Sequence, residues 1–419
     1  MTQELRLVVV AQEFPYPPNH GGRADVWRRL RAFKALGVKT ALVCWYDEGM
    51  TNPSDEELQA VREVVDVLHV VPKRGGLGSV VLRLCRIAAN TPSHAAARVL
   101  DGEQSAAAFT KLIAFKPHGV LLDSPYGGVF ARAVCKRLRV PMFYRSHNIE
   151  HLYFQSQAAA ATGLRDRLAW GLACLHLQQF EKRLQQEARI SFDISADDMA
   201  FWQAQGITNN KWLPPLPEAA LDTAATQAAD TPEQRELTFL GNLHAPNNVQ
   251  GLKWFVEEVM PLVWLKRPQT IFTMAGSGPN DTVRRLGATN ANIRLVENVI
   301  DVPSFLASSR VLVNPVLTGS GVNVKTLDML MTDRPIVSTP QGVAGLVSTL
   351  QSLCLVASSA TQFAYAVIQA LEVPAINLPE RHAGRAMFSV DSVALAVESI
   401  RGVVFGDRDP SNSLIDTNP

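Results

Sequence analysis

The sequence lacks several features that would place the chain in other protein classes. It has no run of about 18 apolar residues, so no transmembrane helix is predicted, and its N-terminal residues do not resemble a signal peptide. Basic residues outnumber acidic ones by only one, and a net charge of +1 gives no reason to expect nucleic-acid binding. We therefore expect a protein that neither spans a membrane nor binds nucleic acid.

Cysteine is scarce and scattered along the chain. The five cysteines are odd in number and show no CxxC spacing, which favours free thiols in a reducing, cytoplasmic environment over a disulfide framework. The His, Cys, Asp and Glu residues form no group with metal-ligand spacing. The sequence thus predicts a cytoplasmic protein with no metal site and no bound cofactor.

The N-terminal segment lacks the GxGxxG motif of dinucleotide-binding proteins. Residues 5–11 are an apolar run typical of a buried strand, and apolar residues at helical spacing predict a helix over residues 24–36. Gly21 and Gly22 end the proline-rich loop between them. Two interpretations are open, a plain turn before the helix or a place where the backbone approaches a ligand closely.

What the chain does contain is a repeated alternation of strands and helices. Apolar residues make up 47% and charged residues 19% of the chain, and 419 residues exceed one ordinary domain. The alternation predicts open parallel sheets covered on both faces, with ligands beyond the carboxyl ends of the strands. A capping-box pattern at Ser54 and Glu57 predicts the start of one helix. After residue 11, further strands are predicted at residues 40–44, 67–71, 119–122, 142–144, 190–194, 237–240, 270–275 and 293–296.

A proline-rich change in composition divides the chain into two halves. Before it, residues 152–187 are predicted to be helical; after it, a helix is predicted at residues 249–264. The predicted division is a domain at residues 1–215, a linker at 216–235, a domain at 236–389, a helix at 390–406 and a flexible tail at 407–419.

The most informative stretch predicts a strand, a glycine loop, a helix and a second strand, at residues 311–315, 317–321, 322–331 and 335–339. The first-turn N–H groups of such a helix, together with its dipole, favour an anion. Lys325 lies in or near that turn, where it could reach a phosphate. Asp328 lies one turn later on the same face and could accept hydrogen bonds from sugar hydroxyls. The alternative is an ordinary helix that carries a solvated Lys–Asp ion pair.

The segment GSGVNVKTLDMLMTDRPIVS, residues 319–338, resembles the nucleotide-sugar site of retaining glycosyltransferases of the GT-B fold, in the family 4 group. It is similar to the subgroup with a Gly-x-Gly loop and a Lys three residues before the acid of the helix. Asp328 stands where Glu is usual, and no carboxylate stands immediately before Gly319, where many members have their first Glu. The resemblance implies an α/β fold of GT-B architecture, with two Rossmann-like, doubly wound parallel-sheet domains facing across a cleft. It also implies that the helix at 390–406 crosses back to the first domain.

The resemblance assigns most donor contacts to the second domain. The segment Gly241 to Asn248 is similar to the family's loop near the donor phosphates, but Asn242 stands where many members have Arg. The expected donor-binding residues are Gly21, Gly22, Gly241, Asn247, Gly276, Gly278, Asn298, Val299, Gly319, Ser320, Gly321, Val322, Asn323, Lys325 and Asp328.

Polar loops after the first-domain strands supply the remaining candidates. A single histidine such as His147 is usually a structural hydrogen-bonding residue, but in the resembled family a histidine in this loop faces the donor sugar. His147, Lys325 and Asp328 are therefore the expected catalytic residues. The expected acceptor-side residues are His20, Tyr126, Asn148 and Glu150.

The predicted function is a hexosyltransferase that moves a sugar from a nucleoside-diphosphate sugar to a hydroxyl of a glycan, a lipid-linked or another acceptor. The family likeness implies retention of configuration. No metal is expected, because Lys325 and the first-turn amides would stabilise the departing diphosphate. A nucleotide-sugar epimerase or phosphorylase of the same fold is the alternative, and a non-catalytic nucleotide or carbohydrate sensor is a third. Basic amphipathic segments at residues 73–98 and 152–187 are either solvated faces or peripheral contacts to the inner face of an anionic membrane.

Overall fold

The architecture comes from a computed structural model that describes residues 3–18, 21–73, 77–160, 163–217, 235–319, 322–372, 376 and 378–406. Three of the expected site residues, His20, Ser320 and Gly321, lie outside the described residues. Most of the predicted linker and the whole tail at 407–419 also lie outside them.

The first domain is built on a parallel sheet in the order β3-β2-β1-β4-β5-β6-β7. Every strand predicted for this half is present. All of them except the edge strand β3 are short runs buried along most of their length. The edge strand β7 was not predicted, since three residues with polar neighbours give no pattern. The strands are β1 (Arg6–Ala11), β2 (Lys39–Asp47), β3 (Val67–Lys73), β4 (Gly119–Asp123), β5 (Met142–Ser146), β6 (Ile190–Asp193) and β7 (Asn210–Trp212).

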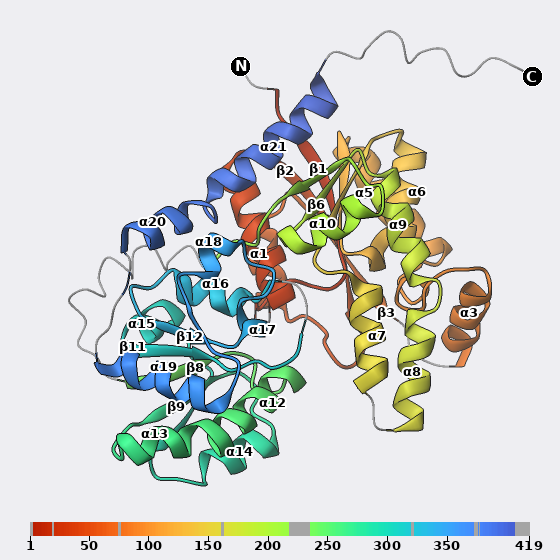
Figure 1. Ribbon diagram of the computed structural model, residues 1–419. Helices are drawn as coiled ribbons and strands as arrows, with labels where there is room; N and C mark the ends of the chain where they lie inside the picture. Colours follow the sequence, from red (N-terminus) through yellow and green to blue (C-terminus); the bar gives the residue numbers. More distant parts are fainter. Residues whose placement is uncertain are drawn as a thin grey trace, which may run out of the picture.

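Helices cover both faces of this sheet (Figure 1). The predicted helical stretch at 152–187 is divided into α7, α8 and α9, and His176 between the last two has a left-handed backbone with φ of 63°. The helices are α1 (Gly21–Ala35), α2 (Asp55–Arg62), α3 (Leu77–Ala88), α4 (Ser93–Ala96), α5 (Gly102–Phe115), η1 (Pro125–Gly127), α6 (Gly128–Leu138), α7 (Glu150–Ala160), α8 (Leu164–Cys174), α9 (Leu177–Glu187) and α10 (Ala196–Ala204).

The second domain repeats this arrangement with a parallel sheet in the order β10-β9-β8-β11-β12-β13. Only β13, two exposed residues at the edge, falls outside the predicted strands. The strands are β8 (Arg235–Leu240), β9 (Phe272–Gly276), β10 (Ile293–Glu297), β11 (Ser309–Asn314), β12 (Ile336–Ser338) and β13 (Leu355–Val356).

The predicted helix at 249–264 is one helical stretch whose middle turn is a π-helix, immediately before Pro261. A proline has no N–H to donate to the preceding turn, which fits a local change of hydrogen-bond register here. The helical segments are α12 (Pro246–Trp254), η2 (Phe255–Val259), α13 (Met260–Lys266), α14 (Asp281–Gly287), α15 (Val302–Ala307), α16 (Val324–Leu330), α17 (Pro340–Val343), α18 (Ser348–Gln351), α19 (Ala360–Glu372), α20 (Leu378–Ala386) and α21 (Val390–Phe405).

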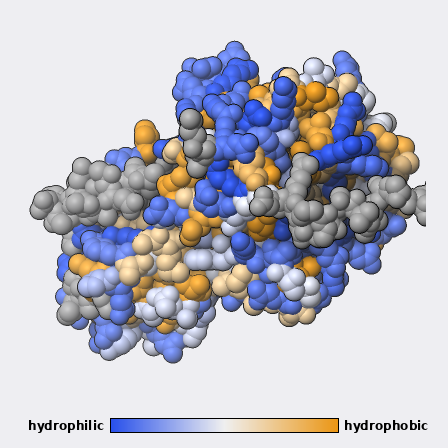
Figure 2. All heavy atoms as spheres, turned by 90° about the horizontal axis from the view of Figure 1, so that it is seen from above, coloured by the Kyte–Doolittle hydropathy of each residue, from blue (hydrophilic) through white to orange (hydrophobic). Residues whose placement is uncertain are grey.

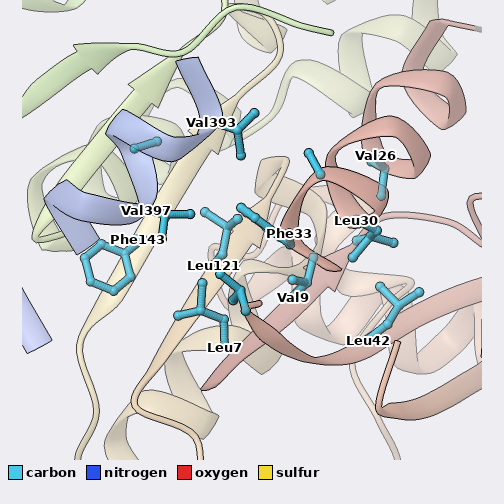
Figure 3. Close-up of a cluster of buried hydrophobic side chains, with 14 of the residues drawn as sticks. Leu7, Val9, Val26, Leu30, Phe33, Leu42, Leu121, Phe143, Val393 and Val397 are labelled. Carbon is cyan, nitrogen blue, oxygen red and sulfur yellow. The ribbon is translucent and has the colours of Figure 1, made fainter. Parts of the chain in front are cut away.

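The last helix, α21, packs against the first domain although it follows the second in the sequence. Val393 and Val397 lie in the same buried cluster as Leu7, Phe33 and Leu121 of the first domain (Figure 3). Its buried positions recur every three or four residues, the spacing of an amphipathic helix. The chain therefore connects the two domains at a second place besides the linker.

In both sheets the second and third strands lie on one side of the first strand, and the fourth and later strands lie on its other side. Such a switch point lies between β1 and β4 in the first domain and between β8 and β11 in the second. Ligands of open α/β sheets bind in the crevice at the carboxyl ends of the strands at this point. A ligand site is therefore expected at the loops after these four strands.

Candidate active site

A cleft of about 1070 Å³ lies between the two domains, where these loops meet. Its lining comes from the start of α1 and the loop after β5 on one side. On the other side it comes from the loops after β8, β9, β10 and β11 and from the start of α16. A volume of this size is at the upper end for small-molecule sites, so a ligand as large as a nucleotide sugar can be accommodated.

Two glycines allow the loops after β8 and β9 to touch. Gly276 has φ of +146°, and a Cβ atom placed on it would lie 1.6 Å from the carbonyl oxygen of Gly241. Only glycine fits at such a position. At this point the cleft is lined by glycine backbone rather than by side chains, which suits the close approach of a ligand.

Lys325 is the basic group at the start of α16. Its ammonium donates to the side-chain carbonyl of Asn248 and lies 4.9 Å from the centre of the Phe239 ring. Burial lowers the pKa of Lys325 to about 7, and no carboxylate among the described residues pairs with it. An incoming phosphate would thus meet a cation that no described protein anion has neutralised.

Asn248 holds Lys325 in place, a role that the sequence did not reveal. The Asn248 side-chain amide donates to the Asn242 carbonyl at 2.8 Å, and its side chain is buried. Asn242 in turn accepts from the backbone N–H groups of His244 and Ala245. The neighbouring Asn247, which was predicted, also lines the cleft. The doubled asparagine in the loop was the available signal, but it does not say which of the two holds the lysine.

Asp328 carries an interaction that the sequence did not predict. Arg28 of α1 donates to both of its carboxylate oxygens, at 3.1 and 3.3 Å, across the cleft. The two side chains are only 10% and 13% exposed, so this is an ion pair between domains and not a solvated pair within one helix. The sequence alternative of a Lys325–Asp328 pair is wrong; the carboxylate turns instead toward the first domain.

The helices α1 and α16 meet at their N-terminal ends. Gly21 opens α1, and a Cβ atom placed on it would lie 3.7 Å from the Val324 side chain of α16. Gly21 and Gly22 were predicted to lie in a loop, but they form the first turn of α1. Because the N-terminal ends of helices carry partial positive charge, both helices favour an anion at this point of the cleft.

His147 is held by a buried network of charged groups. It contacts Asp123 through Nε2, and its Nδ1 atom lies 3.4 Å from Asp25. Arg29 pairs with both carboxylates, and Arg145 pairs with Asp25. Only His147 retains appreciable exposure, 18%, whereas the other four side chains are at most 3% exposed.

The arginines decide the ionisation of the two buried carboxylates. Burial by itself would raise the pKa of Asp123, but Arg29 and His147 outweigh it and hold that pKa well below its ordinary value. Burial likewise opposes ionisation of Asp25, and Arg145 and Arg29 bring its pKa below the ordinary value. Both carboxylates are therefore ionised at neutral pH and fix the orientation of the His147 ring.

Glu150 differs from these carboxylates because no arginine among the described residues pairs with it. Burial, and next the charge of Glu181, raise the pKa of Glu150 to about 8. Tyr126 donates to its carboxylate at 2.8 Å. Glu150 lines the cleft, whereas Tyr126 lies behind it, stacked on Phe154 in a small apolar cluster.

The structure thus brings most of the expected residues to one cleft and leaves a few elsewhere. Tyr126 and Gly278 do not line it, although both lie beside residues that do. The residues that line the cleft without having been predicted include Asp25, Arg28 and Asn248. The predicted residues that line it are Gly21, Gly22, His147, Asn148, Glu150, Gly241, Asn247, Gly276, Asn298, Val299, Gly319, Val322, Asn323, Lys325 and Asp328.

Neither metal ligation nor a membrane span is visible in the described part of the chain. There, no group of three or more His, Cys, Asp or Glu side chains is arranged to hold a metal ion. No helix within the described ranges has both the length and the apolar character to cross a membrane.

Comparison with known proteins finds a family likeness for the second domain. Residues 234–373 match the family described as glycosyl transferases group 1, and these residues carry β8 to β13 and the Lys325 wall of the cleft. The second domain is thus similar to the glycosyl transferases group 1 family. A protein from the cps region of Klebsiella pneumoniae, described as an uncharacterized 44.6 kDa protein, is 23% identical over 376 residues. That match covers 87% of this chain and 90% of the relative.

Solved structures extend the likeness to both domains. Sucrose-phosphate synthase from Thermosynechococcus elongatus matches with a TM-score of 0.63 at 13% identity, covering 96% of this chain and 99% of that one. A glycosyltransferase from Rickettsia africae matches with a TM-score of 0.63 at 12% identity over 97% and 100%. HepE from Anabaena, solved with UDP and glucose, gives 0.60 at 13% identity over 94% and 99%. The chain has the GT-B fold.

Proposed function

We propose that the protein transfers a hexose-like sugar from a nucleoside-diphosphate sugar to an acceptor hydroxyl, with retention of configuration. The observation that carries the proposal is Lys325 at the start of α16, facing the cleft across from His147 of the first domain. A cation that is partly desolvated and not ion-paired with a described carboxylate is suited to a diphosphate. HepE from Anabaena was solved with UDP-glucose, which supports a uridine nucleotide as the first donor to test.

In the proposed reaction the bond between the anomeric carbon and the diphosphate breaks, and its electron pair stays on the phosphate oxygen. Lys325 and the first-turn N–H groups of α16 stabilise that growing negative charge. The acceptor oxygen forms the new bond to the anomeric carbon from the same face, and its proton passes to the departing diphosphate. Retention follows because attack and departure share one face of the sugar.

The first domain supplies the sugar and acceptor side of the site. His147 is oriented by Asp123, and Glu150 is protonated over most of the neutral range because its pKa is about 8. A protonated carboxyl can donate to a sugar or acceptor oxygen while it accepts from Tyr126. Because Lys325 and the helix N-termini already provide positive charge, we propose that the reaction needs no metal, and chelator-resistant turnover is the expected result.

A panel of nucleotide sugars tests this function. Thermal shift should identify a donor, and that donor should release its nucleoside diphosphate slowly in water and faster with acceptor. Stabilisation by a donor without any release would indicate a nucleotide sensor. Interconversion of the donor into an epimer, with no diphosphate released, would indicate an epimerase. Either result contradicts the proposal.

A further inference from the structure

The helix α8 exposes large apolar side chains along one face. Leu164, Leu168 and Leu172, here called the leucine stripe, are 75%, 67% and 42% exposed, and Leu175 just beyond the helix is 44% exposed. On the face of the molecule seen from above, hydrophobic residues are interleaved with hydrophilic ones (Figure 2). Such scattered exposure needs no partner, whereas a continuous stripe on one helix indicates a contact surface.

The charges of α8 are arranged around this stripe. With about 100° between successive residues of a helix, Arg165 and Arg167 fall on the two sides of the leucine stripe. Asp166 falls on the opposite side, nearer the protein, where Ala173 is buried. Neither arginine pairs with a described carboxylate. An apolar stripe bordered by free arginines is the pattern of a helix that lies in a membrane interface.

The nearby helix α3 also exposes large apolar side chains. Val80, Val81, Leu82 and Leu84 are each about half exposed, between 49% and 59%. Both α3 and α8 pack against α4, and they lie at the same end of the first domain (Figure 1). The exposed apolar side chains of the two helices therefore belong to one region of the molecule.

The region around α3 is also positive. Residues 67–100 contain no Asp or Glu. Lys73 pairs with Asp47, and Arg98 donates to the Gln12 carbonyl, so the positive charge of this surface comes from Arg83 and Arg86 of α3. Arg83 donates to the backbone carbonyl and hydroxyl of Ser93, and Arg86 donates to the Ala96 carbonyl. Since these acceptors are neutral, the hydrogen bonds leave the positive charge in place. A surface that is both apolar and positive complements anionic lipid rather than a neutral partner.

We infer that α3 and α8 form a docking surface for an anionic phospholipid bilayer. α7 packs on α8 and begins at Glu150, which lines the cleft, so the docking surface is joined to the first-domain side of the active site. The inference does not depend on the proposed transferase activity, because lipid binding is measured without turnover.

Flotation of the full chain with vesicles tests the inference. The protein should float with vesicles of phosphatidylcholine and phosphatidylglycerol, and much less with phosphatidylcholine alone. The triple variant Leu164→Asn, Leu168→Asn, Leu172→Asn should lose binding by more than about tenfold, because three apolar side chains leave the interface. The double variant Arg165→Gln, Arg167→Gln should lose about fivefold for each charge, and only with the anionic vesicles.

A matched triple variant controls for the general effect of removing exposed leucines. Leu262→Asn, Leu265→Asn, Leu395→Asn changes leucines that are 37%, 77% and 72% exposed on α13 and α21, away from α3 and α8. It should float like the unmodified protein, and all variants should keep the same melting temperature. Equal flotation of both triple variants would overturn the inference. So would a concentration-dependent dimer, seen by sedimentation, that the leucine-stripe variant abolishes, because a second copy would then be the occupant.

Discussion

At the scale of single residues, Lys325 has the clearest chemical assignment. Its ammonium is held by Asn248 and placed over Phe239, both neutral groups, so the positive charge stays available to a ligand. Burial lowers the pKa of Lys325 to about 7, so near neutral pH the lysine is only partly protonated in the free protein. A diphosphate would restore the charge that burial disfavours.

Replacing Lys325 should therefore affect the reaction more than the fold. We expect Lys325→Ala to lower turnover about a hundredfold or more, the usual loss when one stabiliser of developing charge is removed. The melting temperature should stay the same or rise, because a desolvated ammonium is removed from the protein. Steady-state kinetics beside thermal unfolding checks both points, with Lys253→Ala on α12 as a lysine control away from the cleft. Near-normal turnover of Lys325→Ala would exclude the lysine from the mechanism.

The same pKa predicts how nucleotide binding depends on pH. Below pH 7 the free protein already carries the charged lysine, so binding should change little on its account. Above pH 7 binding must draw a proton from solution, and affinity should fall toward tenfold for each pH unit. Calorimetry of nucleoside diphosphate at pH 8, in two buffers with different ionisation enthalpies, should reveal uptake of about one proton. Lys325→Met should abolish this uptake, and its persistence would assign the proton to another group.

The Arg28–Asp328 pair has two interpretations that can be separated by mutation. If Asp328 accepts hydrogen bonds from the donor, Asp328→Ala should weaken nucleoside-diphosphate binding by about 1.5–3 kcal/mol. Arg28→Ala should then leave binding unchanged or improve it, because the donor no longer competes with the guanidinium for the carboxylate. If the pair only joins the domains, the two variants should behave alike. Titration calorimetry of both variants distinguishes the outcomes.

The sequence predicted residues of the site better than their partners. Lys325 and His147 were placed by strand ends and by family likeness, and both line the cleft. Arg28 is 300 positions from Asp328 in the sequence. The residue pattern of its helix does not indicate which arginine faces the cleft and which faces solvent. Such pairings depend on how the two domains face each other, which local patterns do not contain.

At the scale of elements, the contact between the loops after β8 and β9 depends on glycine. A Cβ atom at position 276 would overlap the Gly241 carbonyl, and the φ of +146° is unfavourable for any other residue. Gly276→Ala should therefore cost more than about 3 kcal/mol of unfolding free energy. Gly171→Ala, inside α8 with nothing within 4 Å of the new methyl group, should instead stabilise by about 0.5–1 kcal/mol. Denaturant unfolding measures both, and equal stabilities would contradict the geometry.

Elements with a strong local pattern were predictable, and those fixed by context were not. The capping box at Ser54 and Glu57 is present in both directions at the start of α2. By contrast, the π-helix at 255–259 and the left-handed His176 follow from packing around them, and the helical periodicity continues through both. The start of α1 was placed three residues late, since glycine is a poor helix former and its presence suggested a loop.

At the scale of the whole molecule, two parallel sheets with the same strand order face each other across one cleft. The alternation of apolar strands and amphipathic helices was enough to predict this α/β class, because buried parallel strands are nearly continuous apolar runs. The return of α21 to the first domain was expected only from family likeness. The apolar stripe of α21 predicts that the helix is packed on one face. It does not tell which of the two domains that face contacts, and the structure shows that it is the first.

The central claim is a division of labour across the cleft, with the nucleotide held by the second domain and the sugar addressed by His147 of the first. Its most direct test measures nucleoside-diphosphate affinity and sugar transfer on one preparation of His147→Ala, with exposed His382→Ala of the second domain as the control. We expect affinity within about twofold of the unmodified protein and transfer reduced about a hundredfold or more. Loss of nucleotide binding with transfer preserved in the fraction that still binds would contradict the account.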